Sequence, residues 1–114
     1  MGRASKQKGK RGELELAHEL RKLGVPDARR SQQYCGTESS ADIVGVPKLH
    51  IECKRSERLS IYDAYYQAVK DSGDSGDLPV LMHRRSHQPW LVIMAMDDWV
   101  KLYKAYAQHL ENMR

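Results

Sequence analysis

Two short apolar runs joined by a tight turn constrain the fold of this chain more than any other feature. The runs span residues 41–46 and 49–54, and the turn between them falls at Pro47 and Lys48. Because successive side chains of a strand point to opposite faces, this pattern predicts a pair of strands. Alternation divides the second run into one face with Leu49, Ile51 and Cys53 and another with His50, Glu52 and Lys54.

Helical spacing recurs on both sides of this unit. Apolar residues three and four positions apart predict helices over residues 10–23 and 60–71, and a last helix capped by Asp97 or Asp98. Ser60 and Asp63 have the spacing of a capping box at the start of the second helix.

Three further segments complete the predicted sheet. Residues 28–34 and 79–83 read as short strands, and residues 90–96 are apolar almost without interruption. Such a run is typical of a central strand covered on both faces. The resulting order is α-β-β-β-α-β-β-α, which predicts an α/β or α+β domain with a mixed five-stranded sheet flanked by helices. A length of 114 residues fits one domain.

The charge is concentrated at the amino-terminal end. The net charge is +4, and residues 1–12 hold five basic residues and no acid. We expect residues 1–9 to form a basic mobile arm and residues 10–114 a single domain. A basic arm fits contact with a phosphate backbone, although it could equally serve only solubility. No apolar run approaches a membrane span, and the two isolated cysteines suggest a reduced intracellular protein.

Four residues have the composition of a metal-dependent nuclease site. Glu13 falls on the core-facing stripe of the first helix, where a carboxylate is costly without a partner such as a metal. Asp42, Glu52 and Lys54 lie at the ends of the two paired strands. Hard divalent cations bind carboxylates, and a phosphodiester under attack is stabilised by a cation beside the metal.

These stretches resemble the PD-(D/E)XK nuclease superfamily, and most of all the small Holliday-junction resolvases of archaea and their phage relatives. The matching segments are KGKRGELELAHEL, GTESSADIVGV and HIECKR, with a weaker match at YYQAVKD, and together they cover residues 8–95. The chain departs from the motif in one place, because Ala41 and not proline precedes Asp42.

The resemblance implies a restriction-endonuclease-like core and a set of site roles. Asp42 and Glu52 would hold one or two Mg²⁺ ions, with Mn²⁺ as an expected substitute, assisted by the Cys53 backbone carbonyl and completed by Glu13. Lys54 would orient or deprotonate the attacking water, and Gln67 would reach the site from its helix. The DNA contacts would come from Arg3, Lys6, Lys8, Lys10, Arg11, Arg29, Arg30, Ser39, Ser40, Arg55, Arg84 and Arg85.

The resemblance implies a homodimer that cleaves branched DNA. Its expected location is the cytoplasm of a bacterial host, as a host or phage-encoded protein, and no membrane partner is expected. The apolar last strand and helix could supply the dimer surface. The alternatives are a flap, replication-repair or non-specific nuclease of the same superfamily, a non-catalytic DNA-binding protein, and a protein-interaction module.

Several residues also have an ordinary structural interpretation. Gln67 could be a surface residue, and Ser39 with Ser40 a plain flexible turn. His50 reads as a strand-surface residue, because it has no second histidine at metal spacing. Cys53 should face the core and be chemically inert.

Overall fold

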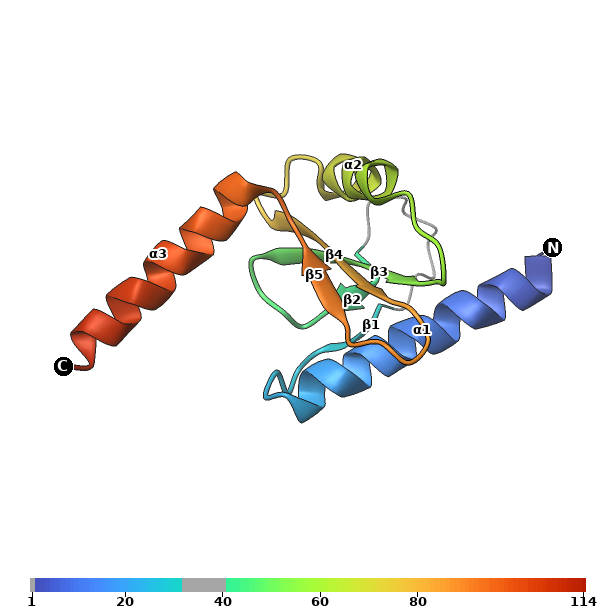
Figure 1. The fold of residues 1–114 in the computed structure, drawn as a ribbon, viewed down its shortest axis with the longest axis horizontal. Helices are drawn as coiled ribbons and strands as arrows, with labels where there is room; N and C mark the ends of the chain where they lie inside the picture. Colours follow the sequence, from blue (N-terminus) through green and yellow to red (C-terminus); the bar gives the residue numbers. More distant parts are fainter. Residues whose placement is uncertain (1, 32–40) are drawn as a thin grey trace.

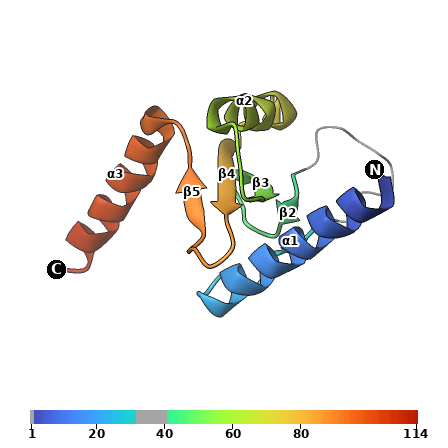
Figure 2. The ribbon, with the colours of Figure 1, turned by 45° about the vertical axis from the view of Figure 1, so that its right-hand side comes forward.

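A five-stranded sheet with a helix on each face forms the body of the protein. The structure is a computed structural model, and it describes residues 2–31 and 41–114, with the side chains described from residue 9 onward. Helix α1 lies across one face of the sheet and helix α2 covers the other, while helix α3 projects away from both (Figures 1 and 2). Within these residues no helix is long and apolar enough to cross a membrane.

The predicted order of helices and strands is confirmed. The elements are α1 (Gly2–Lys22), β1 (Arg29–Arg30), β2 (Ile43–Val44), β3 (Leu49–Arg55), α2 (Ile61–Ser72), β4 (Leu78–Arg84), β5 (Leu91–Ile93) and α3 (Met96–Asn112). The strands lie side by side in sequence order. Strands β3 and β4 are parallel, joined through α2, and the other neighbours are antiparallel. The sheet is therefore mixed, as the sequence pattern predicts.

Helix α1 begins at Gly2, eight residues before the start that apolar spacing indicates. The segment before Lys10 holds no proline and several good helix formers, so the backbone helix continues into it. Residues 2–9 are therefore helical, not irregular as the sequence suggests, and the mobility of the arm stays a prediction.

The core lies between α1 and the sheet. Leu16 and Ala17 of α1 are fully buried against Ile43, Ile51 and Val80 of three neighbouring strands. Leu49 and Cys53 are partly buried in the same cluster, which confirms the predicted division of β3 between two faces. The opposite face of β3, with His50 and Glu52, is therefore turned toward α2.

Strand β5 corrects one prediction. It pairs only with β4 and lies at the edge of the sheet, so residues 90–96 do not form a central strand covered on both faces. Leu91 and Val92 remain 55% and 59% exposed. An apolar run indicates that a strand will be buried, but it does not say whether the cover comes from the same chain. Helix α3, which follows β5, has Ala95 as its N-cap residue in place of Asp97 or Asp98.

Candidate active site

Asp42 is held between two strands by three hydrogen bonds. Its backbone N–H donates to the Ile51 carbonyl at 2.9 Å, and its own carbonyl accepts from the Ser31 N–H at 2.9 Å. Its Oδ2 accepts from the backbone N–H of Cys53 at 2.8 Å. These bonds fix the Asp42 carboxylate beside Cys53 of β3, between Glu52 and Lys54.

Glu52 is a buried carboxyl group beside two other acids. It is 8% exposed, and burial followed by the charges of Asp42 and Asp71 raises its pKa to about 9. Its Oε1 lies 2.8 Å from Nε2 of His50, whose own pKa is lowered by burial. At neutral pH the carboxyl and imidazole groups are therefore both uncharged, and they share a hydrogen bond and not an ion pair.

His50 is not the strand-surface residue that the sequence suggests. Its side chain is 5% exposed and lies beside the end of α2, where it lines a cavity with Asp71 and Ser72. Because α2 covers this face of β3, a histidine that alternation places with Glu52 becomes buried with it.

Glu13 reaches the same region from α1. Its Oε1 accepts a hydrogen bond from Nε of Arg30 at 2.7 Å. Burial and then the nearby charge of Asp42 raise the pKa of Glu13. The costly carboxylate on the core-facing stripe thus has a protein partner, while its role in holding a metal stays a prediction. Asp42 is the neighbour that Glu13 and Glu52 share.

Asp71 is a site residue that sequence reasoning missed. It lies near the end of α2, and its charge raises the pKa of Glu52. Gln67 is exposed and donates from Nε2 to Oδ1 of Asp71 at 2.9 Å. The sequence places Gln67 and Asp71 four residues apart on one side of the helix, but it does not show that this side faces Glu52. Gln67 therefore touches the acid cluster through Asp71.

Cys53 and Lys54 follow Glu52 in β3. Alternation places Lys54 on the face of Glu52, and its side chain is half-buried. Cys53 is a free cysteine packed against the core. Burial raises the pKa of its thiol, with the charge of Asp42 as the next cause. The thiol stays protonated and unreactive at neutral pH, as the sequence predicts.

The donor chemistry of this cluster fits a hard cation. Carboxylates gathered around Asp42 repel one another when ionised, and a divalent ion would relieve that repulsion. Across residues 2–31 and 41–114, however, no three Asp, Glu, His or Cys side chains are arranged to hold an ion. Asp42, Glu52 and Glu13 each have a carboxylate oxygen bonded to a protein partner. A cation would therefore bind through the second oxygen of a carboxylate or displace the present protein partner.

The buried acid predicts a pH dependence of stability. A folded-state pKa of about 9 for Glu52 lies above its ordinary value of 4.5, so the folded protein keeps a proton that the unfolded chain releases. We expect the free energy of unfolding without metal to fall as the pH rises from about 7 to 9. Below about pH 6.5 the lowered pKa of His50 makes the free energy of unfolding rise with pH instead, because the unfolded chain then binds a proton that the folded protein does not.

This prediction is tested by thermal unfolding in EDTA across that pH range. The Glu52→Gln variant removes the titrating group and should show a flatter profile between pH 7 and 9. A wild-type stability that is constant or increases over this interval would contradict the pKa assigned to Glu52.

The basic residues predicted to contact DNA fall into two groups. Lys10, Arg29 and Arg30 line a groove of about 710 Å³ between α1 and β1, where Arg21, which the sequence analysis did not single out, joins them. Arg30 connects this groove to the acid cluster, because it also binds Glu13. Arg11 is exposed on α1.

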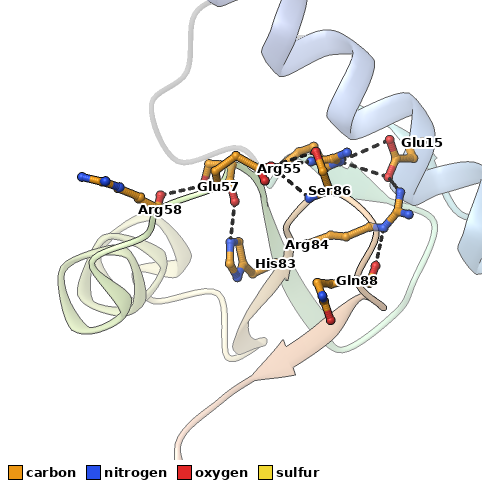
Figure 3. Close-up of polar contacts among 9 residues, drawn as sticks. Glu15, Arg55, Glu57, Arg58, His83, Arg84, Ser86 and Gln88 are labelled. Atoms are coloured by element: carbon orange, nitrogen blue, oxygen red, sulfur yellow. Dashed lines mark hydrogen bonds and ion pairs between the residues drawn. The ribbon is translucent and has the colours of Figure 1, made fainter.

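The second group consists of Arg55 and Arg84, which form ion pairs with acidic residues. Figure 3 shows Glu15 between Arg55 and Arg84, with its Oε1 3.3 Å from Nε of Arg55 and 2.5 Å from Nη1 of Arg84. Arg55 also lies 3.4 Å from Glu57, which in turn accepts from the backbone N–H of Ser86 at 2.9 Å. These contacts join α1 to β3 and β4, so Arg55 and Arg84 have a structural role there, and their contact with DNA stays a prediction.

Some predicted residues cannot be located. Ser39 and Ser40 lie outside the described residues, and so do the side chains of Arg3, Lys6 and Lys8. Arg85 is exposed in the turn between β4 and β5, and in the described part of the chain it forms no ion pair.

One of the comparisons with known proteins identifies a family for this chain. Residues 4–114 match the model of a family described as "Phage putative PDDEXK endonuclease". Neither the comparison with curated proteins nor the comparison with solved structures found a match.

Proposed function

The chain belongs to this phage PD-(D/E)XK endonuclease family, and from that premise we propose that it is a Mg²⁺-dependent enzyme that hydrolyses phosphodiester bonds of branched DNA. One observation supports the proposal above the others: Asp42 is the shared neighbour of Glu13 and Glu52. Buried acids around one carboxylate are unfavourable without a cation, and a protein that only packs or binds DNA has no use for them.

The metal would be held by carboxylates from three segments. Asp42, Glu52 and Glu13 are the proposed ligands, together with the backbone carbonyl of Cys53, and Mn²⁺ is an expected substitute. A bound ion of this kind lowers the pKa of water and stabilises charge on phosphate oxygens. Glu52 would release its carboxyl proton on binding, and His50 is placed to keep hydrogen-bonding to the same side chain.

Lys54 and Arg30 would act on the DNA. Lys54 lies on the strand face of Glu52, where its ammonium group would stabilise the negative charge that grows on the attacked phosphate. Arg30 now binds Glu13 at 2.7 Å and would be free to contact a phosphate once Glu13 binds a cation. The products would be 5′-phosphate and 3′-hydroxyl ends.

The groove beside Arg30 supplies a path for the phosphate backbone. Lys10, Arg21, Arg29 and Arg30 bring four positive charges to one concave surface that leads toward the acid cluster. Binding through such a surface depends on charge and not on base sequence. This supports a preference for DNA shape over sequence, and cutting two opposed strands of a branched substrate would take two copies of the chain.

The test is cleavage of three end-labelled substrates: an immobile four-way junction, a flap and a linear duplex. We expect Mg²⁺ or Mn²⁺ to support cutting, EDTA to abolish it, and the junction to be cut fastest. The Glu52→Gln variant, which keeps the size and hydrogen bonding of the side chain, should bind the junction without cutting it.

The other outcomes separate the rival functions. Faster cutting of the flap would replace junction resolution with a trimming activity, and equal rates on all three substrates would indicate a non-specific nuclease. Junction binding by the wild-type protein with no cleavage under any metal would show a DNA-binding protein and would overturn the proposal. Full activity in EDTA would rule out the metal site.

A further inference from the structure

Most residues of helix α3 are exposed within the described structure, and only Asp98, Val100 and Ala107 are half-buried. None of its residues is buried, and it projects from the sheet without packing on α1 or α2 (Figure 1). A helix of 17 residues that meets the rest of the protein only near its start is marginally stable in water. The helix therefore requires another surface to pack against, and its sequence indicates what kind of surface that is.

Apart from Leu102, the exposed large apolar residues of α3 follow a seven-residue repeat that ends at Met113, the C-cap residue of the helix. Counting from Met96 the intervals are three, four, three, four and three, which is the a and d pattern of a coiled coil. The residues in these positions are Met96, Trp99, Tyr103, Tyr106, Leu110 and Met113, all of them about half-exposed or more. The indole of Trp99 and the ring of Tyr103 already stack at 5.5 Å within the helix. A period of 3.5 favours another helix as the partner over a flat surface or a nucleic acid.

The charges of α3 favour a second copy in the antiparallel direction. The first turn carries Asp97 and Asp98, while at the other end the charges of Glu111 and Arg114 offset each other. Antiparallel pairing keeps the two acidic first turns apart and brings opposite ends of the helix dipoles together, whereas parallel pairing places the acidic first turns and the like dipole ends side by side. The same pairing is isologous, so it closes after two copies.

A cleft at the base of α3 has room for the end of the second helix. It has a volume of about 430 Å³, is lined by Tyr62, Tyr65, Tyr66, Ile93 and Met96 among others, and is largely apolar. Antiparallel alignment places Met113 of the second copy opposite Met96, at the edge of this cleft. Covering the α3 stripe would bury roughly 800 Å² on each chain, which is the size of a standard stable interface.

We propose that two copies of this chain associate through antiparallel pairing of their α3 helices, with the carboxyl-terminal end of each helix seated at the cleft between α2 and β5 of the other. Leu91 and Val92, the exposed apolar residues of the edge strand β5, come just before α3 in the chain. The inference deepens the two-copy form of the proposed function, but it does not depend on nuclease activity, because association is measured without DNA.

Sedimentation of the full chain at micromolar concentrations is the first test. The wild-type protein should sediment as a dimer, and Tyr106→Glu should weaken association by roughly 100-fold or more, because it places a charge in the centre of the seam. Gln108→Glu adds the same charge two residues away on the outer side of α3 and should leave the dimer intact. A wild-type monomer, or equal effects of the two substitutions, would overturn the proposal.

Cross-linking tests the direction independently of stability. Met96→Cys and Met113→Cys chains are prepared separately and then mixed under mild oxidation. We expect a cross-linked dimer only in the mixture, with the wild-type protein reporting any background from Cys35 and Cys53. Cross-linking of either variant alone would indicate parallel helices, and no cross-link above background in any sample would exclude this contact. A dimer that forms while cleavage is absent would leave this inference standing and reject the nuclease function.

Discussion

Asp42→Asn is expected to lower the cleavage rate by roughly 1,000-fold and, in EDTA, to raise the melting temperature of the protein. Asparagine retains a carbonyl oxygen that can accept the hydrogen bond from the Cys53 N–H, so the two strands stay joined. What it removes is the negative charge that raises the pKa of Glu13 and of Glu52. The acid that the reaction needs is the one that destabilises the folded protein without a cation.

The measurement pairs cleavage with thermal unfolding in EDTA and in Mg²⁺. Mg²⁺ should raise the melting temperature of the wild-type protein, since it binds the folded state alone, and should have little effect on the variant. Asp74→Asn makes the same chemical change at an exposed position after α2 and should alter neither readout. Retained cleavage by Asp42→Asn would remove Asp42 from the site, and a lower melting temperature in EDTA would contradict the repulsion inferred here.

Gly12→Ala is expected to destabilise the protein by about 1–3 kcal/mol, although alanine normally stabilises a helix. Gly12 lies where α1 crosses β3, and a Cβ there would come within 2.6 Å of the Arg55 Cβ. Because Arg55 is held by Glu15 and Glu57, it cannot move aside without breaking those contacts. The helix must shift instead, and Glu13 follows Gly12 directly, so cleavage should fall with stability.

Gly9→Ala is the matched control in the same helix. Among the described residues nothing outside the neighbouring turns of α1 lies within 4 Å of the Cβ that it would add, so the intrinsic helix preference is what changes. We expect a gain of up to about 1 kcal/mol in unfolding free energy and unchanged cleavage, measured by denaturant unfolding and the junction assay. Changes of the same sign in the unfolding free energy of the two variants would show that α1 and β3 pack less closely at Gly12 than this structure indicates.

Local sequence patterns were sufficient for the order of elements and for three of the clustered acids, Glu13, Asp42 and Glu52. Alternation along residues 49–54 and apolar spacing in the helices depend on neighbours in the chain, and these neighbours are visible in the sequence. For the same reason Asp42 could be placed just before a paired strand, and Glu13 could be recognised as an acid on an apolar stripe. The predicted position of Glu52 at a strand end was wrong, because β3 continues to Arg55 and Glu52 is its middle residue. The resemblance to a nuclease superfamily rested on those residues, and the family match agrees with it.

Contacts between distant segments were decided only by the tertiary structure. Nothing local distinguishes Asp71 from any other acid near a helix end, and only the packing of α2 over β3 brings it to Glu52 and buries His50. In the same way the apolar run at residues 90–96 indicates burial but not its source, and β5 proved to be an edge strand followed by an exposed helix. The physical reason is range: strand and helix periodicities act over a few residues, whereas the pKa of a carboxyl group and the exposure of a strand depend on groups that the chain brings together from far apart.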